Sequence, residues 1–149
     1  MTLLRRWKRH EGGQAAVEFA LVLPFLLVML IGIVEFGRAW NEHQVITDAA
    51  RETARRACLG DAIGEDVARQ VAKDAMAAAG INADDRGAEI QFPTDLAADP
   101  DVLLDGGSNT LVVVTIDLPY QFTFFGPLVK WATGQTNIML QTSFTMRNE

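Results

Sequence analysis

A long apolar run near the N-terminus constrains the fold of this chain more than any other feature. Residues 19–34 contain no charged side chain, and extending the run back to residue 15 adds a single formal charge, on Glu18. At about 1.5 Å rise per residue, a helix of this length spans a hydrocarbon core of about 30 Å. The run is apolar on every face and too long to be the core helix of so small a domain. It therefore predicts a transmembrane helix, which we place at residues 14–37 and which includes Phe19, Pro24 and Gly32.

The proline in this segment predicts a bend. Pro24 has no backbone N–H and its ring clashes with the preceding turn, so it interrupts helical hydrogen bonding. Within a membrane, neighbouring helices can cover the carbonyl that loses its partner.

Basic residues before the apolar run predict its orientation. Arg5, Arg6, Lys8 and Arg9 precede it, and positive flanks remain in the cytoplasm. We therefore expect residues 1–13 to face inward and residues 38–149 to be exported. A cleaved secretory signal is the alternative, but it would have a shorter apolar core and a small-x-small site on its far side. No convincing site of that kind follows residue 33.

Glu18 requires an explanation, because a carboxylate inside the apolar slab costs about 2.5–3.5 kcal/mol on insertion scales. A cut after Gly13 would make Gln14 the new N-terminus and Glu18 the fifth mature residue. The new α-amino group, with an ordinary pKa near ~8, could pair with this carboxylate in a neighbouring subunit. Equally, Glu18 could lie at the interface one turn inside the helix start, where the helix dipole favours negative charge.

The remaining composition limits the choice of partners. The chain has 149 residues, of which 49% are hydrophobic and 21% charged, which suits one folded domain plus a membrane helix. Acids outnumber bases after the apolar run, which argues against a nucleic-acid partner. Cys58 is the only cysteine, so an internal disulfide and a cysteine-rich zinc site are excluded. We expect Cys58 to pack as a small apolar group.

Past the apolar run, the helical pattern continues. Small side chains recur at three- and four-residue spacing, at Ile46, Ala49, Ala50, Thr53, Ala54 and Ala57. The opposite face is charged, with Asp48, Arg51, Glu52, Arg55 and Arg56. We expect the small stripe to pack on the sheet of the same chain; a seam between subunits is the alternative.

A second helix and a sheet should complete the exported domain. The helix is expected to start at Gly60–Asp61 and end at Gly80, with an apolar face of Ile63, Val67, Val71, Ala75 and Ala78. Strands are expected at Ile90 and Phe92, at residues 110–118 with a continuation beyond Pro119 on an edge or bulge, and at residues 137–147. The predicted class is α+β, with a long N-terminal helix and a small antiparallel sheet of about three strands.

The segment 124–134, FFGPLVKWATG, is unusually apolar for a loop. Trp131 and Lys130, beside Phe125 and Leu128, suit a bilayer interface. They also suit a cap on the sheet core or a contact with a partner subunit. We rank the core cap first, the partner contact second and the membrane third.

No motif for catalysis or cofactor binding is present. His10 falls in the basic leader, and His43 stands alone and is expected to be solvated. An acidic loop carries Asp99, Asp101 and Asp105, but Leu103 and Leu104 interrupt the spacing of a calcium loop. We therefore predict no metal, no cofactor, no small-molecule substrate and no enzymatic activity.

The N-terminal block resembles a known pattern. A basic leader, a glycine, four residues, a glutamate and an apolar run are similar to the prepilin-type signal of type IV pilins and pseudopilins. Residues 12–57 more specifically resemble the TadE-like family of the Tad (Flp-type) tight-adherence pilus system. The resemblance rests on AAVEFALVLP at 15–24, the EFGR turn at 35–38 and TDAARETARRA at 47–57, and the closing TMRNE at 145–149 is also similar.

The resemblance implies roles for particular residues and partners. Gly13 and Gln14 would flank the cut made by a prepilin peptidase on the cytoplasmic side, although Gly12 leaves a cut one residue earlier open. Glu18 would serve processing or subunit registration. The partners would be membrane lipid, the prepilin peptidase, major and minor pilin subunits and the inner-membrane assembly platform of a Tad system.

The expected function is thus that of a minor pilin or pseudopilin in assembly of an adhesion pilus. The protein would cross the bacterial inner membrane once and reside there or in the pilus. An uncleaved bitopic protein, whose exported domain is a structural or binding subunit of an envelope complex, is the alternative. A membrane-tethered enzyme is a third class, and it has no motif behind it.

Overall fold

The computed structural model describes residues 11–59, 64–92 and 111–147. They form the long helix α1 (Glu11–Leu59), the helices α2 (Glu65–Ala78), α3 (Ala83–Arg86) and α5 (Gly126–Thr133), and the strands β1 (Glu89–Gln91), β2 (Leu111–Gln121) and β3 (Asn137–Arg147). The predicted α+β class, with a long N-terminal helix, a further helix and an antiparallel sheet of three strands, is confirmed for these residues.

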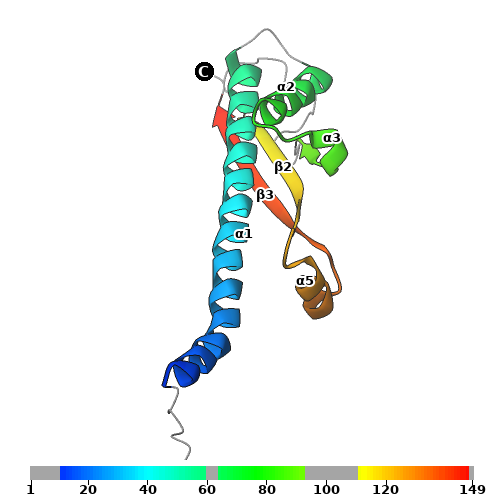
Figure 1. Cartoon of the computed structure of the whole chain (residues 1–149). Coiled ribbons are helices and arrows are strands. Elements are labelled where there is room, and N and C mark those ends of the chain that lie inside the picture. Colours follow the sequence, from blue (N-terminus) through cyan, green and yellow to red (C-terminus); the bar gives the residue numbers. More distant parts are fainter. Residues whose placement is uncertain (1–10, 60–63, 93–110, 148–149) are drawn as a thin grey trace, which may run out of the picture.

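Helix α1 runs without interruption from the apolar segment into the head, which is the remainder of the described chain after the apolar run. Its 49 residues include the EFGR segment at 35–38, which is an ordinary part of the helix. Pro24 lies inside α1, and Figure 1 shows the N-terminal end of the helix, in dark blue, bent away from the rest. The missing N–H and the ring of proline account for a bend in this part of the helix.

The sheet has the strand order β1-β2-β3 and is antiparallel throughout. β2 pairs with β3 over its whole length, from Leu111 opposite Arg147 to Gln121 opposite Asn137, whereas β1 covers only Thr115 to Asp117 of β2. Pro119 therefore lies where β2 has a partner on one side only. The expected edge position is confirmed, and β2 continues through the proline without a break.

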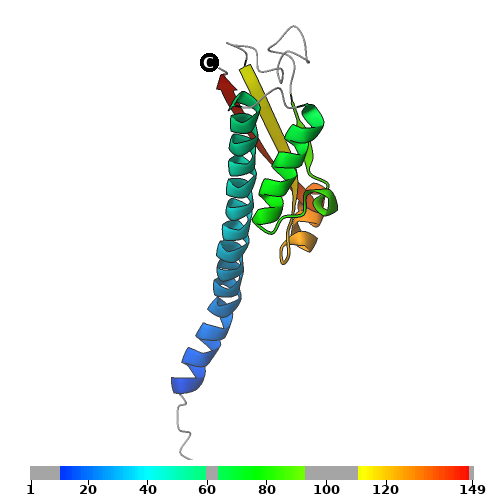
Figure 2. The same cartoon turned by 90° about the horizontal axis from the view of Figure 1, so that it is seen from above.

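The core lies between α1 and the sheet, and α2 packs beside α1 (Figure 2). Every residue of the predicted small stripe is buried, and so is Cys58, whose thiol pKa is raised by burial. The facing side of β2 contributes Val112, Val114, Ile116, Leu118 and Tyr120. The stripe thus packs on the chain's own sheet, as expected, because small side chains let α1 approach the strands closely.

The charged face of α1 also follows the prediction. Arg51 lies 3.4 Å from Asp48, and Glu52 accepts hydrogen bonds from Arg56 at 2.7 Å and Arg55 at 3.2 Å. Hydrogen bonds from Arg56 and Arg55 lower the pKa of Glu52. These are exposed pairs of small energetic weight.

The buried face of the second helix is centred one position away from the predicted apolar face, although Val71 and Ala75 of that face are half-buried. Ala68, Ala72 and Met76 are buried, while Val67 is half exposed to solvent. Two alanines on the buried face allow α2 to lie close to α1. Close packing of the two helices therefore decides which face is buried, although valine is the more hydrophobic residue. The helix begins at Glu65, later than expected, and residues 60–63 lie outside the described part of the chain. Gly80 takes a φ of +84° just past the helix end, as a terminating glycine does.

The segment 124–134 is not a loop. It contains α5, which begins with Gly126 and Pro127 and ends before Gly134 at a φ of +76°. The core-cap interpretation is also wrong, since Phe124, Leu128 and Trp131 are exposed. Instead, α5 lies at the end of the β2–β3 hairpin, where Gln121 pairs with Asn137, beside the middle of α1 (Figure 1).

Candidate functional site

The N-terminal turns of α1 carry the predicted processing residues. Gly13 and Gln14 lie in α1, which begins at Glu11, and the amide Nε2 of Gln14 donates to Glu18 Oε1 at 3.1 Å. Both side chains are exposed and one helical turn apart. Among the described residues, Glu18 therefore has a partner on its own helix, one that sequence reasoning did not consider.

The remaining predicted site residues follow the helix. Phe19 is exposed, Pro24 lies inside α1, and Gly32 faces the hairpin, where an added Cβ would lie 3.9 Å from Phe125 Cε2. The basic residues Arg5, Arg6, Lys8 and Arg9 and the histidine His10 lie outside the described part of the chain, as do Asp99, Asp101 and Asp105.

The apolar part of α1 is uncovered by the protein itself. α1 contains an eighteen-residue stretch apolar enough to cross a membrane, and none of that stretch is buried within the protein. The core helix of a water-soluble protein would pass the same test of composition but would be mostly buried. This single apolar helix near the N-terminus indicates a membrane-anchored protein.

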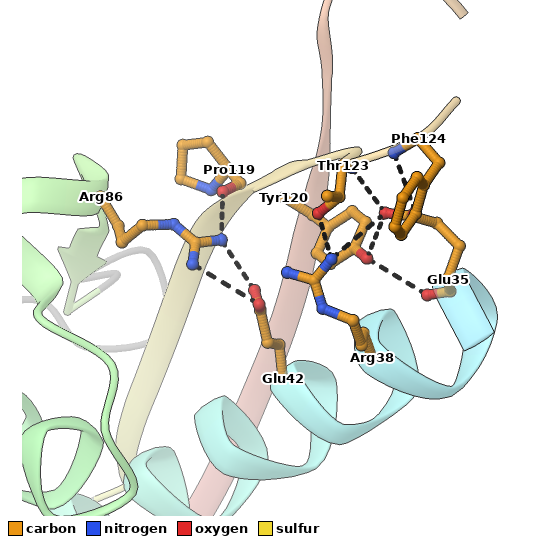
Figure 3. A network of polar contacts seen from close by, with 8 residues as sticks. All are labelled: Glu35, Arg38, Glu42, Arg86, Pro119, Tyr120, Thr123 and Phe124. Atoms are coloured by element: carbon orange, nitrogen blue, oxygen red, sulfur yellow. Dashed lines mark hydrogen bonds and ion pairs between the residues drawn. The ribbon is translucent and has the colours of Figure 1, made fainter. Parts of the chain in front are cut away.

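A buried carboxylate directly follows the C-terminal end of the apolar run. Glu35 is only 3% exposed, although it follows Val34 directly and lies on a surface helix. Its oxygens face the chain that leaves β2 toward α5 (Figure 3). A buried carboxylate is costly unless hydrogen bonds satisfy it, so its partners determine whether the arrangement is stable.

Three donors satisfy the Glu35 carboxylate. The hydroxyl of Tyr120 lies 2.9 Å from Oε1, the backbone N–H of Thr123 donates to Oε1 at 2.8 Å, and the backbone N–H of Phe124 donates to Oε2 at 3.2 Å. Arg38 Nη1 lies 3.7 Å from Oε1 and donates to the hydroxyl of Thr123. We call these five residues the Glu35 network.

The network holds an otherwise unpaired piece of backbone. The strand pairing of β2 ends at Gln121, so the amides of Thr123 and Phe124 have no ladder partner. Glu35 replaces that partner with a side chain from α1. The effect is to fasten the base of α5 to the helix at the point where the apolar run ends.

A second polar contact supports the same side of α1 (Figure 3). Arg86 Nη2 donates to Glu42 Oε2 at 2.7 Å and to the carbonyl oxygen of Pro119 at 3.2 Å. Glu42 is two helical turns beyond Glu35, and Arg86 ends α3. His43, expected to be solvated, is half-buried and stacks on Trp40 with 6.3 Å between ring centroids.

The Glu35 network is not apparent from the sequence. Glu35 and Arg38 stand there only as part of the EFGR segment, and the residues that complete the network lie 85 or more positions away. A signal was present, because an acid at the membrane end of an apolar helix and a tyrosine after a β-branched strand both need polar partners.

Tyr120 yields a prediction that needs no substitution. Its burial and its bond to Glu35 raise its pKa from 10.0 to about 12. The raised pKa means that protonated Tyr120 contributes to the stability of the folded state. This contribution is fully present below pH 10.0 and is lost between pH 10.0 and about 12 as pH rises. Tyr120 is the only tyrosine, so phenolate absorbance of the detergent-solubilised protein reports it alone. We expect the native midpoint to exceed that of the denatured chain; equal midpoints would contradict the network.

No metal centre can be built from the described residues, where groups of three or more His, Cys, Asp or Glu side chains are absent. The polar groups that converge in this region surround the carboxylate of Glu35, which already accepts hydrogen bonds from three donors. Within residues 11–59, 64–92 and 111–147, the arrangement therefore serves attachment of one part of the chain to another.

Comparison with known proteins gives one match. The family model described as TadE-like protein matches residues 13–55, which lie wholly within α1. The match confirms the resemblance seen in residues 12–57 and covers less than a third of the 149 residues. No curated protein and no solved structure matches the chain.

Proposed function

We propose that this chain, whose residues 13–55 match the TadE-like family, is a minor pilin or pseudopilin that takes part in assembly of a Tad-type adhesion pilus. The match associates it with a Tad pilus system. The single observation that carries the proposal is the combination in one helix of Gly13, Glu18 and an apolar stretch left uncovered by the protein.

In this proposal, residues 1–13 are a basic leader, residues 14–37 a transmembrane helix and residues 38–149 an exported domain. The leader faces the cytoplasm, and a prepilin peptidase removes it after Gly13. The mature helix then packs laterally against pilin subunits and the assembly platform. Passing from lipid to a fibre moves the helix between two apolar environments, so the hydrophobic cost is modest.

The proposal assigns a structural role and no reaction. The described residues supply hydrogen-bonded attachment between α1 and the hairpin, and the family association is with pilus formation. The exported head, fixed on a continuous helix, would present its surface to other subunits.

Fibre formation tests the proposal. A deletion of the gene should abolish or strongly reduce Tad-type pili on the cell surface, and the wild-type gene should restore them. Mass spectrometry of the native protein should find Gln14 at its N-terminus. A native protein that begins at Met1, together with normal piliation in the deletion strain, would favour the uncleaved bitopic protein instead.

Glu18 provides a sharper test within the helix. We expect Glu18→Ala to lower pilus abundance at least about tenfold, because the α-amino group of a neighbouring mature subunit loses its carboxylate partner in an apolar setting. Counting pili by electron microscopy measures this. Asp48→Ala, which removes an exposed acid elsewhere on α1, is the matched control and should leave abundance unchanged. Unchanged piliation in Glu18→Ala would remove this residue from the assembly site.

A further inference from the structure

We propose that α5 and its neighbours lie in the headgroup region of the bilayer, so that the protein contacts the membrane at two places. The contact surface consists of the exposed side chains of Phe124, Leu128, Trp131, Ile138 and Met139. We call this set the apolar tip. It belongs to the membrane-resident form of the protein, and the occupant is lipid.

The position of the apolar tip along α1 is the first argument. An added Cβ on Gly32 would lie 3.9 Å from Phe125 Cε2, so the residue that directly precedes α5 lies against α1 inside the apolar run. Gly32 is two residues before the end of that run, which is about 3 Å along the helix. Helices that lie in the membrane interface are buried by about 5–10 Å. A bilayer around residues 15–34 would therefore reach α5.

The two sides of α5 give the second argument. Phe125 and Val129, one helical turn apart, are half-buried on the protein side. Phe124, Leu128 and Trp131 follow the other side at helical spacing and are exposed, Trp131 by 84%. An amphipathic helix against water would present polar groups there. Large apolar side chains on that surface instead continue the uncovered apolar surface of α1.

Charge is the third argument. Residues 121–138 contain no acid, and Lys130 is their single charged residue and is exposed. The chain as a whole has a formal net charge of −6, so this stretch departs from the rest. A lysine and a tryptophan beside aliphatic residues are the composition of a membrane interface, where the lysine head can reach lipid phosphates.

The Glu35 network explains how the tip is held at this depth. It ties the backbone of Thr123 and Phe124, which immediately precede α5, to the first residue past the apolar run. Trp40, about one turn further along α1, is also exposed and stacks on Phe36. Trp40 and Trp131 would thus contribute to one aromatic belt on two different elements.

Lipid-depth quenching tests the proposal on the full chain. The protein has three tryptophans, so Trp7→Phe with Trp40→Phe leaves Trp131 as the only one. This variant is reconstituted in vesicles of phosphatidylglycerol and phosphatidylcholine brominated at shallow acyl positions. We expect bromine to quench Trp131 about twofold or more strongly than a tryptophan placed on α2, and we expect Trp131 to be protected from aqueous iodide.

Two control variants, both built on Trp7→Phe with Trp40→Phe, fix the scale. Trp131→Phe with Gln70→Trp places the probe on the exposed face of α2, far from the apolar run, and should show iodide quenching only. Trp131→Phe with Leu26→Trp places it in the middle of the run and should respond to deeply brominated lipid.

The outcomes separate this inference from the proposed function, with which it shares only the insertion of α1. Quenching of Leu26→Trp by lipid but of Trp131 by iodide overturns the apolar tip alone. Failure of both to respond to lipid overturns the insertion of α1 and the inference with it. Protection of Trp131 from bromine and iodide alike, with crosslinks that rise with protein-to-lipid ratio, shows a protein partner on the tip and also overturns the lipid proposal.

Discussion

Replacing Glu35 by alanine releases the hairpin tip from α1 while leaving the rest of the head folded. The substitution leaves the amides of Thr123 and Phe124 without an acceptor, and it leaves the Tyr120 hydroxyl only the backbone carbonyl oxygen of residue 35, at 3.2 Å. Each unsatisfied donor costs about 1–3 kcal/mol, so with two of them we expect opening of this contact to become at least about 30-fold more frequent.

Amide hydrogen exchange of the full chain in lipid nanodiscs measures this opening residue by residue. The amides of residues 123 and 124 should exchange faster in Glu35→Ala, whereas those of Val114 and Ile116 in β2 should keep their protection, because the core between α1 and the sheet is untouched. The exchange rate in Glu35→Gln should lie between those of the wild type and Glu35→Ala. The glutamine side chain keeps one acceptor oxygen, but its N–H groups face other donors.

Tyr120→Phe and Glu52→Ala serve as controls. Tyr120→Phe removes one of the donors and should accelerate exchange less than Glu35→Ala does. Glu52→Ala removes an acid whose partners are the exposed Arg55 and Arg56, and exchange at residues 123 and 124 should not change. Unaltered exchange there in Glu35→Ala would show that the network does not hold the hairpin.

The second large effect concerns proteolysis at the N-terminus. We expect Gly13→Asp to abolish leader removal, so that a precursor about thirteen residues longer accumulates in membranes. In the proposed maturation, the bond between Gly13 and Gln14 is cut; it lies within α1, so the helix would have to unwind there to enter a protease. Glycine favours this, because each glycine in a helix costs about 1 kcal/mol relative to alanine. An aspartate at this position removes that freedom and adds bulk beside the bond.

Gly12→Asp is the matched control, since it places the same acid one residue earlier. If the cut follows Gly13, Gly12→Asp leaves the mature N-terminus at Gln14. The reverse pattern, with Gly12→Asp blocked and Gly13→Asp processed, moves the cut one residue upstream. Mass spectrometry of the N-terminal peptide from both variants distinguishes these results. Normal maturation of both variants would contradict processing at this glycine pair.

The features predicted best from the sequence are those set by local periodicity. The small stripe from Ile46 to Ala57 and the charged pairs of Glu52 appear as expected, because helical spacing alone places them. The three-stranded sheet follows from β-branched runs and alternation. The apolar run at 15–34 is apparent from composition, and the structure adds that it is uncovered.

The errors arise where tertiary packing outweighs local pattern. Val67 is more hydrophobic than Ala68, yet Ala68 is buried because α2 needs a small residue against α1. The segment around Trp131 begins with Gly and Pro, which indicates a loop, but Pro127 stands in the first turn of α5, where proline is tolerated. Two of the partners of Glu35 are distant backbone amides, which carry no side-chain signal.

α1 has no break between residues 34 and 38, so a tilt of its apolar part is transmitted to the head. The helix extends about 36 Å beyond Glu35 to its end at Leu59, and the sheet packs along that length. A tilt of the apolar part by ~20° would therefore swing the far end of the head sideways by about 12 Å. Pro24 lies before this stretch, so a bend there would leave residues 35–59 to move as one piece. A small change in the tilt of the apolar part within the bilayer therefore produces a large sideways displacement of the head.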